Sequence, residues 1–555
     1  MTYVRCGAVI GFVALFLWYF DSATNQPLVD SCWVLAIVVW GLQVKALSPA
    51  PWLGIRPRRA DLVPLVLILA IFAAAWLPFF DNWRWAYTGD SFGVFASGYW
   101  LGKNGLQQNI LSVHGIDDCF TVLWSVSYNW LMRLFGPTLF WHRCGQVIMA
   151  CLALTAIYAF FTRVLGRMWG AAIVVATAIN YVWLWFTYVS YLKIDSFIFY
   201  YLALTWATLI WYHPERLGLW MLGGLTAGLS LLFTPTAWSG VIFVSVGLGI
   251  FALVTRRFGA LTVFTIAFLL AAIPILREVP WLLTMTRSQT APNLDRDYLE
   301  RMFKIILFLP YASPLSTLGA YGAFLKWPLG PLYLVGLGIA ALSTVAPLRR
   351  RLRAPGITPV LLALLLWDVT LLTFTNKGYG NPSHKRAYNL IPLQVFFALL
   401  PAYVLYAWSR RYRWARAVTL GLTAVALAVY GYANVELMAF PPAHLYGTNI
   451  FDGLIELRQR FPQQPLVVIT SPQCPLATLP RETLFQDVYK ILDNVTLTDA
   501  FTDATVTDAC RQHAVICYDT DFDQPKMQPL LESHQGTLRS FPLLNSVELV
   551  CYGCV

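Results

Sequence analysis

The chain has 555 residues, of which 58% are hydrophobic and only 12% are charged. That composition is much more apolar than the average of soluble globular proteins, so an ordinary soluble fold is excluded. The net charge of +11 at pH 7 comes largely from short loops between apolar runs, which is a signature of membrane topology and not of nucleic-acid binding. The sequence therefore predicts a polytopic α-helical membrane protein without a nucleic-acid partner.

Apolar runs follow one another along most of the chain. A helix that crosses a membrane needs about 20 mainly apolar residues, and we count thirteen candidate spans. The first run lacks a small-residue cleavage site, so we expect an uncleaved anchor and not a signal peptide. The candidate spans are 5–20, 31–48, 61–80, 141–162, 169–187, 195–212, 217–234, 237–255, 260–277, 331–347, 357–375, 389–408 and 416–434.

Basic residues mark alternate loops, which orients the spans. With the N-terminus in the cytoplasm, the inner segments hold two acids, Asp61 and Glu215, against a large excess of lysine and arginine. This is the positive-inside rule, and an odd number of spans places the C-terminus outside. We expect a multi-pass protein of the cell inner (plasma) membrane. The inner cations are Arg5, Lys45, Arg56, Arg58, Arg59, Arg163, Arg167, Arg216, Arg256, Arg257, Arg349, Arg350, Arg351, Arg353, Arg410, Arg411, Arg413 and Arg416.

Three outer segments are long, and they define the predicted domains. Residues 1–434 form a transmembrane domain with outer loops at 81–140 and 278–330. Residues 435–555 are rich in Asp, Thr, Gln and Pro and are expected to form a small periplasmic or extracellular α/β domain. The tail contains strand-like runs at 465–470, 514–518 and 546–551 and a helix-like run at 482–492.

Half of the ten cysteines fall in this tail, where an oxidising compartment permits one or two disulfides. Cys551-Tyr-Gly-Cys554 has the spacing of a redox motif. No helix follows it, however, and no second cysteine pair has the spacing of a metal site, so a structural disulfide is the favoured interpretation.

A carboxylate stands at the start of the first long outer loop. Asp90 precedes aromatic residues such as Phe92, Phe95 and Tyr99 at near-helical spacing, which predicts a helix on the membrane surface with Asp90 near its beginning. Asp90 could cap that helix, because Asp binds its unpaired N–H groups, or it could act in catalysis. The two roles are compatible.

A second polar cluster lies later in the same loop. His114, Asp117 and Asp118 could bind a divalent metal ion, because carboxylates suit hard cations and histidine widens the choice to transition metals. The alternative is a solvated loop in which Asp118 caps the amphipathic stretch 121–134.

Two further outer sites carry positive charge. Lys193 and Asp195 stand at the mouth of a span and either snorkel to the interface or line a polar pocket. The segment 376–388 contains Lys385 and Arg386, on the side that usually avoids cations. A bound anion explains this charge, since arginine grips phosphate in a bidentate way; contact with anionic lipid headgroups is the alternative.

Several of these segments, in their order, resemble a known family. The acid at Asp90 is followed by Arg133-Leu-Phe-Gly136 and then by Arg143. Lys193-Ile-Asp195 precedes a later span, Leu231-Leu-Phe-Thr-Pro-Thr236 ends a glycine-rich one, and Lys385-Arg-Ala-Tyr-Asn-Leu-Ile-Pro392 stands near the end. Over residues 61–410 the chain resembles the GT-C glycosyltransferases, near the protein mannosyltransferases and the aminoarabinose transferases.

The resemblance implies a GT-C-like fold and a hexosyl or pentosyl transferase that takes one sugar from a polyprenyl-phosphate carrier. The acceptor is a hydroxyl of a lipid, glycan or protein at the outer face. Asp90 would be the general base of an inverting attack. Arg386, with Lys385 and Lys193, would bind the donor phosphate, and Asp195 and Tyr388 would support the pocket.

Three positions depart from the family pattern. Asp90-Ser91 replaces Asp-Glu, Asp117-Asp118-Cys119 lies where many relatives have Lys-Pro-Pro, and Arg386-Ala387-Tyr388 replaces Arg-Tyr. The acids at 117 and 118 therefore suggest a metal in place of a lysine. The alternative functions are a transporter or flippase of lipid-linked sugars, which should show inverted repeats, and a polymerase or ligase, whose longest outer loop usually comes late.

Overall fold

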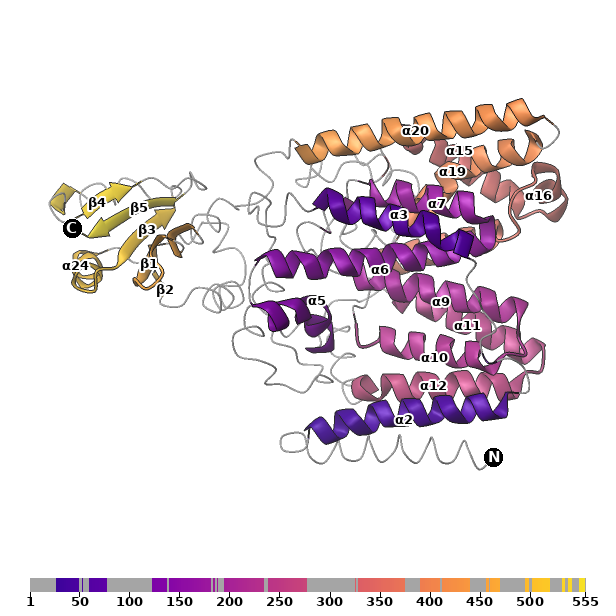
Figure 1. Ribbon diagram of the computed structural model, residues 1–555, viewed down its shortest axis with the longest axis horizontal. Helices are drawn as coiled ribbons and strands as arrows, with labels where there is room; N and C mark the ends of the chain where they lie inside the picture. The colour runs from indigo at the N-terminus through magenta and orange to yellow at the C-terminus, as the bar shows by residue number, and fades with distance from the viewer. Residues whose placement is uncertain are drawn as a thin grey trace.

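The computed structural model shows an antiparallel helical bundle and a separate five-stranded sheet (Figure 1). It describes residues 26–48, 52, 59–76, 122–136, 139–180, 183–184, 187, 194–233, 238–276, 325, 328–374, 390–409, 412–439, 456–458, 460–469, 495–498, 502–519, 532–534, 538–541 and 549–554.

The bundle consists of apolar helices that run back and forth between two ends. Four of the described helical segments are long and apolar enough to cross a membrane: Arg59–Trp76, Phe140–Leu165, Ile391–Trp408 and Arg413–Asn434. The helices are α2 (Gln26–Leu47), α3 (Arg59–Trp76), α5 (Val122–Phe135), α6 (Leu139–Leu165), α7 (Arg167–Ala178), α9 (Ile194–Tyr212), α10 (Leu217–Ser230), α11 (Trp238–Val254), α12 (Phe258–Leu276), α15 (Leu329–Ser343), α16 (Ala346–Leu352), α17 (Thr358–Phe374), α19 (Ile391–Trp408) and α20 (Arg413–Ala439).

These helices confirm a helical architecture suited to a membrane, whereas the number of thirteen spans stays a prediction. Each predicted span from 31–48 to 416–434 overlaps one apolar helix. Some, such as α7 and α10, are shorter than a full crossing. The first predicted span, 5–20, lies outside the described residues.

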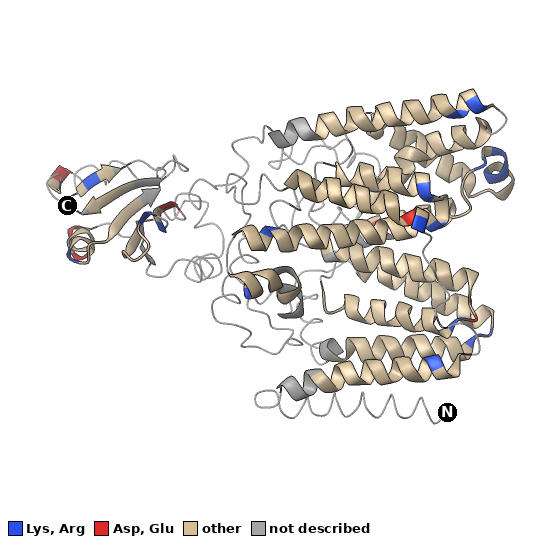
Figure 2. Cartoon of the chain, viewed as in Figure 1, with Lys and Arg blue, Asp and Glu red and all other residues tan. Residues whose placement is uncertain are grey.

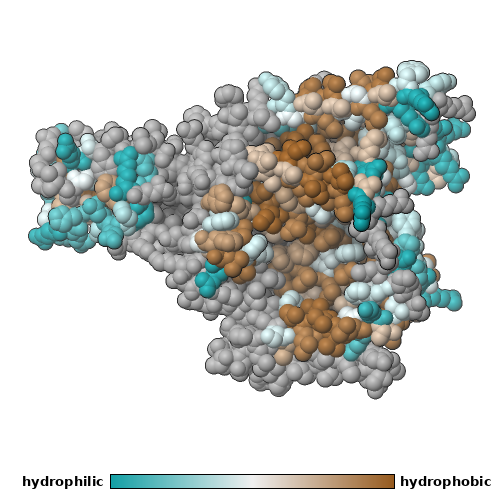
Figure 3. All heavy atoms as spheres, in the orientation of Figure 1, coloured by the Kyte–Doolittle hydropathy of each residue, from teal (hydrophilic) through white to brown (hydrophobic). Residues whose placement is uncertain are grey.

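Large apolar side chains cover the outside of the bundle. Ile71 on α3 is 70% exposed and Leu422 on α20 is 65% exposed. Figure 3 shows this apolar surface over the bundle, whereas hydrophilic residues gather at one bundle end and on the sheet. A surface of this kind suits contact with lipid, because a bilayer core offers no hydrogen bonds to polar groups.

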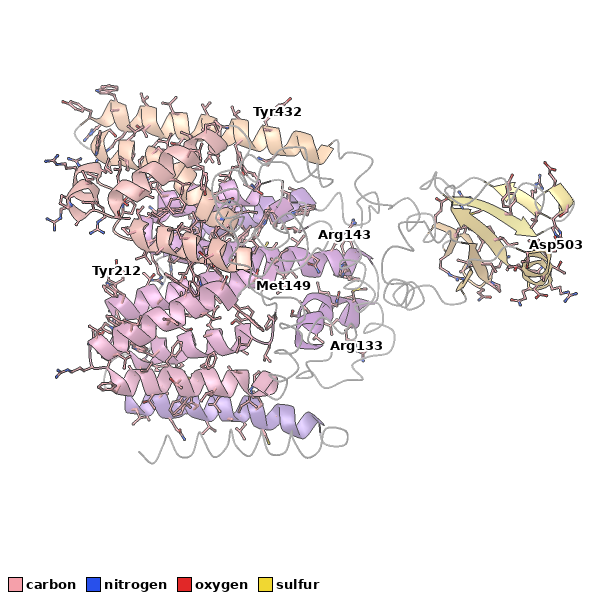
Figure 4. The ribbon with its side chains drawn as sticks, turned by 180° about the vertical axis from the view of Figure 1, so that it is seen from behind. Arg133, Arg143, Met149, Tyr212, Tyr432 and Asp503 are labelled. Atoms are coloured by element: carbon pink, nitrogen blue, oxygen red, sulfur yellow. The ribbon has the colours of Figure 1, made fainter. Side chains whose placement is uncertain are left out.

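Positive charge is concentrated at one end of the bundle, where α16 lies (Figure 2). The lysine and arginine residues of the described bundle helices gather there, with the exception of Arg133 and Arg143 at the opposite end (Figure 2 and Figure 4). Several of them also tie helices together: Arg353 Nη1 donates to the Ala407 carbonyl at 2.7 Å, and Arg167 Nη1 to that of Ala60 at 2.8 Å. We call this end the basic rim.

Helices α10 and α12 approach each other through glycine. A Cβ atom on Gly224 would lie 2.2 Å from the Phe264 carbonyl oxygen, and one on Gly228 would lie 2.4 Å from that of Phe268. Small residues four apart let two helix backbones meet, which is how helices associate without a hydrophobic driving force in lipid.

The C-terminal sheet has the strand order β2-β1-β3-β5-β4. Strand β1 pairs in parallel with β2 and β3, whereas β5 pairs antiparallel with β3 and β4. Helix α24 (Asp503–Arg511) begins at Thr502, whose side chain accepts the Thr505 N–H. The strands are β1 (Leu466–Ile469), β2 (Val495–Thr498), β3 (Val515–Asp519), β4 (Leu538–Phe541) and β5 (Leu549–Cys554).

Strands β1, β3 and β5 fall within or overlap the three runs predicted to be strands. The helix predicted at 482–492 lies outside the described residues, and the domain boundary at 435 stays a prediction. Cys510 forms a disulfide, in agreement with the expectation of one or two disulfides in the tail.

The glycine contact predicts that Gly224→Ala destabilises the bundle. Alanine is normally better than glycine inside a helix by about 1 kcal/mol, but the clash with the Phe264 carbonyl should outweigh this gain, since overpacking costs about 1–3 kcal/mol. The midpoint of thermal unfolding in detergent should fall. Gly247→Ala in α11 is the matched control, because a Cβ there meets nothing within 4 Å. Equal midpoints for the two variants would contradict the close approach.

Candidate functional site

Most of the predicted site residues lie outside the described residues. These are Asp90, His114, Asp117, Asp118, Lys193, Lys385, Arg386 and Tyr388. Asp195 is the second residue of α9, and its side chain is also outside the described part. Their roles stay predictions, and the geometry of the site is built from its described neighbours.

The described part of the predicted first outer loop is α5 and the corner between α5 and α6. Gly136 ends α5 with a φ of 106°, a left-handed conformation that glycine adopts without strain. Its N–H donates to the Met132 carbonyl at 3.1 Å. Phe135 then stacks on Trp141 with ring centroids 4.4 Å apart. The Leu-Phe-Gly motif thus turns the chain sharply and fixes α5 against the beginning of α6.

A buried hydrogen bond joins the two helices of this corner. His142 Nδ1 donates to Asn129 Oδ1 at 2.7 Å, and both side chains are fully buried. Because Nδ1 is the donor, the lone pair of the neutral ring lies on Nε2. The bond therefore orients the His142 ring at the end of the bundle opposite the basic rim.

Two more polar side chains extend this corner along α6. Arg143 is 2% exposed, and its guanidinium stays charged at any physiological pH. Gln146 lies one turn after His142 and is fully buried. Within the described part of the chain, neither its amide nitrogen nor its amide oxygen has a hydrogen-bond partner. A buried amide without a partner is costly, about 1–3 kcal/mol, so it is a place where a polar ligand group would be stabilised.

The corner has a distinct place in the charge pattern. Figure 4 shows Arg143 and Arg133 at the bundle end that faces the sheet, whereas Tyr212 lies at the other end. Arg133 on α5 is exposed and Arg143 is buried, so this end presents one accessible and one enclosed positive charge. The arrangement can attract an anion and hold polar groups close to the membrane surface.

The sequence analysis noted Arg143 but missed His142, Asn129 and Gln146. A signal was present: the stretch Phe140-Trp-His-Arg-Cys-Gly-Gln146 places three polar side chains in the first two turns of an apolar helix. Polar residues inside membrane helices usually face the interior and mark function.

A second buried polar cluster lies deeper in the bundle. Tyr200 on α9 donates a hydrogen bond to Asp368 on α17, and Asp368 is 2% exposed. The neighbouring Trp367 donates from Nε1 to the Ser239 carbonyl of α11 at 2.9 Å. These bonds connect three helices, and the sequence analysis did not single out Asp368 within the span 357–375.

No group of three His, Cys, Asp or Glu side chains that could hold a metal ion occurs among the described residues. The metal proposed for His114, Asp117 and Asp118 falls outside them, so it stays a prediction.

Solved structures similar to the chain include ArnT from Cupriavidus metallidurans and an oligosaccharyltransferase from Archaeoglobus fulgidus. ArnT bound to undecaprenyl phosphate is 14% identical, with 88% of this chain and 98% of that chain covered and a TM-score of 0.47. Apo ArnT is 14% identical, with 89% and 98% covered and a TM-score of 0.48. The oligosaccharyltransferase, in complex with zinc and sulfate, is 12% identical, with 88% and 72% covered and a TM-score of 0.43.

Both kinds of protein are GT-C glycosyltransferases, the class that the sequence motifs resemble. No family model and no curated protein matches the chain. Because all three TM-scores are below 0.5, the likeness carries no argument about function or about individual residues.

The Tyr200–Asp368 contact generates a stability prediction. Tyr200→Phe leaves a buried carboxylate without its donor, which should cost about 1–3 kcal/mol and lower the midpoint of thermal unfolding. Tyr212→Phe, in the same helix but 65% exposed, removes the same hydroxyl and should change little. The double variant Tyr200→Phe, Asp368→Leu should regain part of the loss. A midpoint that is unchanged in Tyr200→Phe would contradict a structural role for the bond.

Proposed function

We propose that this chain is a membrane glycosyltransferase that moves one sugar from a polyprenyl-phosphate carrier to an acceptor hydroxyl at the outer face. The observation that carries the proposal is the buried polar corner of Asn129, His142, Arg143 and Gln146. It lies at the bundle end opposite the basic rim, where the long predicted outer segments begin. The motif order from Asp90 to Tyr388 supports the same class of enzyme.

In this proposal the basic rim faces the cytoplasm and the polar corner faces outward. The positive-inside rule supports that orientation, because cytoplasmic loops carry the excess of lysine and arginine. The N-terminus is then cytoplasmic, and the sheet lies in the periplasm or outside the cell. The membrane lipids and the lipid-linked donor meet the enzyme at the outer boundary.

The chemistry divides between a base and a set of cations. Asp90 accepts the proton of the acceptor hydroxyl as its oxygen attacks the anomeric carbon, which requires hydrogen-bond reach. The bond to the lipid phosphate breaks on the opposite side, so the configuration inverts. Arg386, Lys385 and Lys193 offset the charge of the departing phosphate, with Asp195 and Tyr388 beside them. His114, Asp117 and Asp118 would hold a divalent metal ion if the enzyme uses one.

The described corner contributes a buried positive charge and a place for polar groups. Arg143 lies in a dry environment, where charge acts more strongly on an anion than it does in water. The amide of Gln146 offers a donor and an acceptor to a hydroxyl of sugar or acceptor. His142, held by Asn129, keeps Nε2 oriented for the same purpose.

A second candidate function is transport of a lipid-linked sugar. The buried Asp368 favours it, because carboxylates inside membrane helices often serve proton relays in transporters. Mass spectrometry of surface glycans and lipids from cells with and without the chain separates the two. A purified transferase that is supplied with the lipid-linked sugar adds one sugar mass to an acceptor, whereas a purified transporter does not.

Asp90→Asn should abolish sugar transfer and leave membrane insertion and the unfolding midpoint intact. The loss should be about 10²-fold or more, since a general base contributes about 10²–10⁴-fold. Asp508→Asn on α24 removes an exposed carboxylate and is the control. The measurement is transfer from a synthetic polyprenyl-phosphate sugar by purified protein; wild-type rates in Asp90→Asn would remove this residue from the mechanism.

Gln146→Leu tests whether the amide of Gln146 stabilises the fold or binds the substrate. Replacing a buried amide that lacks a partner by an apolar group should leave the unfolding midpoint equal or higher. Transfer should fall by about twofold to tenfold in kcat/KM, the value of one hydrogen bond. Gln43→Leu is the matched control for Gln146→Leu, because the amide oxygen of Gln43 on α2 also has no partner within the described helices. Unchanged transfer in Gln146→Leu would exclude the amide from substrate binding.

A further inference from the structure

Two buried cysteines face each other in the middle of the C-terminal sheet. Cys517 on β3 is the register partner of Cys551 on β5. Both side chains are fully buried, and both are free thiols, although Cys510 of the same tail is in a disulfide. The glycosyl transfer proposed above makes no use of this pair.

The strand geometry fits a bond between these two sulfurs. Residues directly opposite in an antiparallel pair have Cα atoms about 4.5–5.5 Å apart. A disulfide requires about 4.4–6.8 Å between Cα atoms. The two cysteines can therefore be joined without a shift of either strand.

The sheet gives Cys551 a neighbour that the CxxC spacing does not suggest. Ile516 and Tyr552 pack with Val506 of α24 on one face. Successive residues of a strand alternate between the two faces, so Cys517 and Cys551 lie together on the other face. The cross-strand pair is therefore set by the register of β3 and β5 and not by sequence spacing.

The burial of the pair controls when it can react. Burial and a hydrogen bond with the Cys551 thiol raise the pKa of Cys517 well above its usual value. A thiol with a raised pKa forms little thiolate, and the thiolate is the reacting species. Oxidation is therefore slow in the closed sheet and proceeds when β3 and β5 separate or before they have assembled.

We propose that Cys517 and Cys551 form a redox-active dithiol that closes to a cross-strand disulfide in the outer compartment. The oxidant is a disulfide, either of a thiol-oxidising protein or of oxidised glutathione. One thiolate attacks it to form a mixed disulfide and releases one thiol; the second thiolate then attacks the protein sulfur and releases the other. The pair loses two protons and two electrons, and the oxidant takes them up as two thiols. The bond locks the central strand β3 to β5.

The test uses the full-length protein in detergent, reduced with a dithiol and then exposed to oxidised glutathione. It is done once in native buffer and once in mild urea, which opens the sheet. Remaining thiols are alkylated, and the peptides are analysed by mass spectrometry. We expect a peptide that links 517 to 551 with the loss of two hydrogens, formed faster in urea.

Cys517→Ser should abolish this link and leave Cys551 open to alkylation in urea. Cys151→Ser, a free cysteine on α6, should retain the link and is the control. The wild-type result needs no variant, so a poorly folded variant does not prevent the test. Alkylation of both Cys517 and Cys551 under both conditions, or a link from Cys551 to Cys554, would overturn the proposal.

Discussion

The whole bundle depends on one constraint: a group that is polar and buried in lipid must find its partner inside the protein. The structure meets it with hydrogen bonds between separate segments of the bundle. Asn180 donates from Nδ2 to the Tyr430 hydroxyl at 2.5 Å, and His142 is held by Asn129. Tyr200 binds Asp368 in the same way. Each bond restrains how the segments that it joins can rotate against each other.

The two ends of the bundle meet this constraint in different ways. At the basic rim, arginine side chains bind backbone carbonyls of neighbouring helices and close the structure, as Arg353 does at Ala407. At the opposite end, the α5–α6 corner keeps a buried charge at Arg143 and the amide of Gln146 close to the surface. A reaction that is confined to one face of a membrane requires polar groups at that face, and the bundle carries them at the α5–α6 end. The proposed transfer therefore belongs at the α5–α6 end.

The sequence predicted the features that depend on local pattern. Apolar runs located the helices, and β-branched runs located β1, β3 and β5, because both signals come from adjacent residues. Strands β2, Val-Thr-Leu-Thr, and β4, Leu-Arg-Ser-Phe, were not predicted, because they are half polar, whereas the equally short β1 is wholly apolar.

Features that depend on tertiary contacts were harder to predict. The sequence shows polar residues at the beginning of α6, but the burial of His142 and Gln146 beside α5 is visible only in the structure. The pairing of Cys517 with Cys551 follows from strand order, which places β5 beside β3, and no spacing in the sequence reveals it. The Leu-Phe-Gly motif was recognised by its resemblance to a family motif. The physical reason for its glycine is the positive φ of Gly136, which only the backbone structure shows.

The central claim is that the α5–α6 end faces away from the cytoplasm, and the most direct test is the sidedness of its exposed residues. Arg133→Cys on α5 and Arg351→Cys on α16 place one thiol at each end. Intact cells are treated with a membrane-impermeant thiol reagent, and labelled peptides are identified by mass spectrometry. The account predicts labelling of Arg133→Cys in intact cells and of Arg351→Cys only after permeabilisation. The reverse pattern would contradict it.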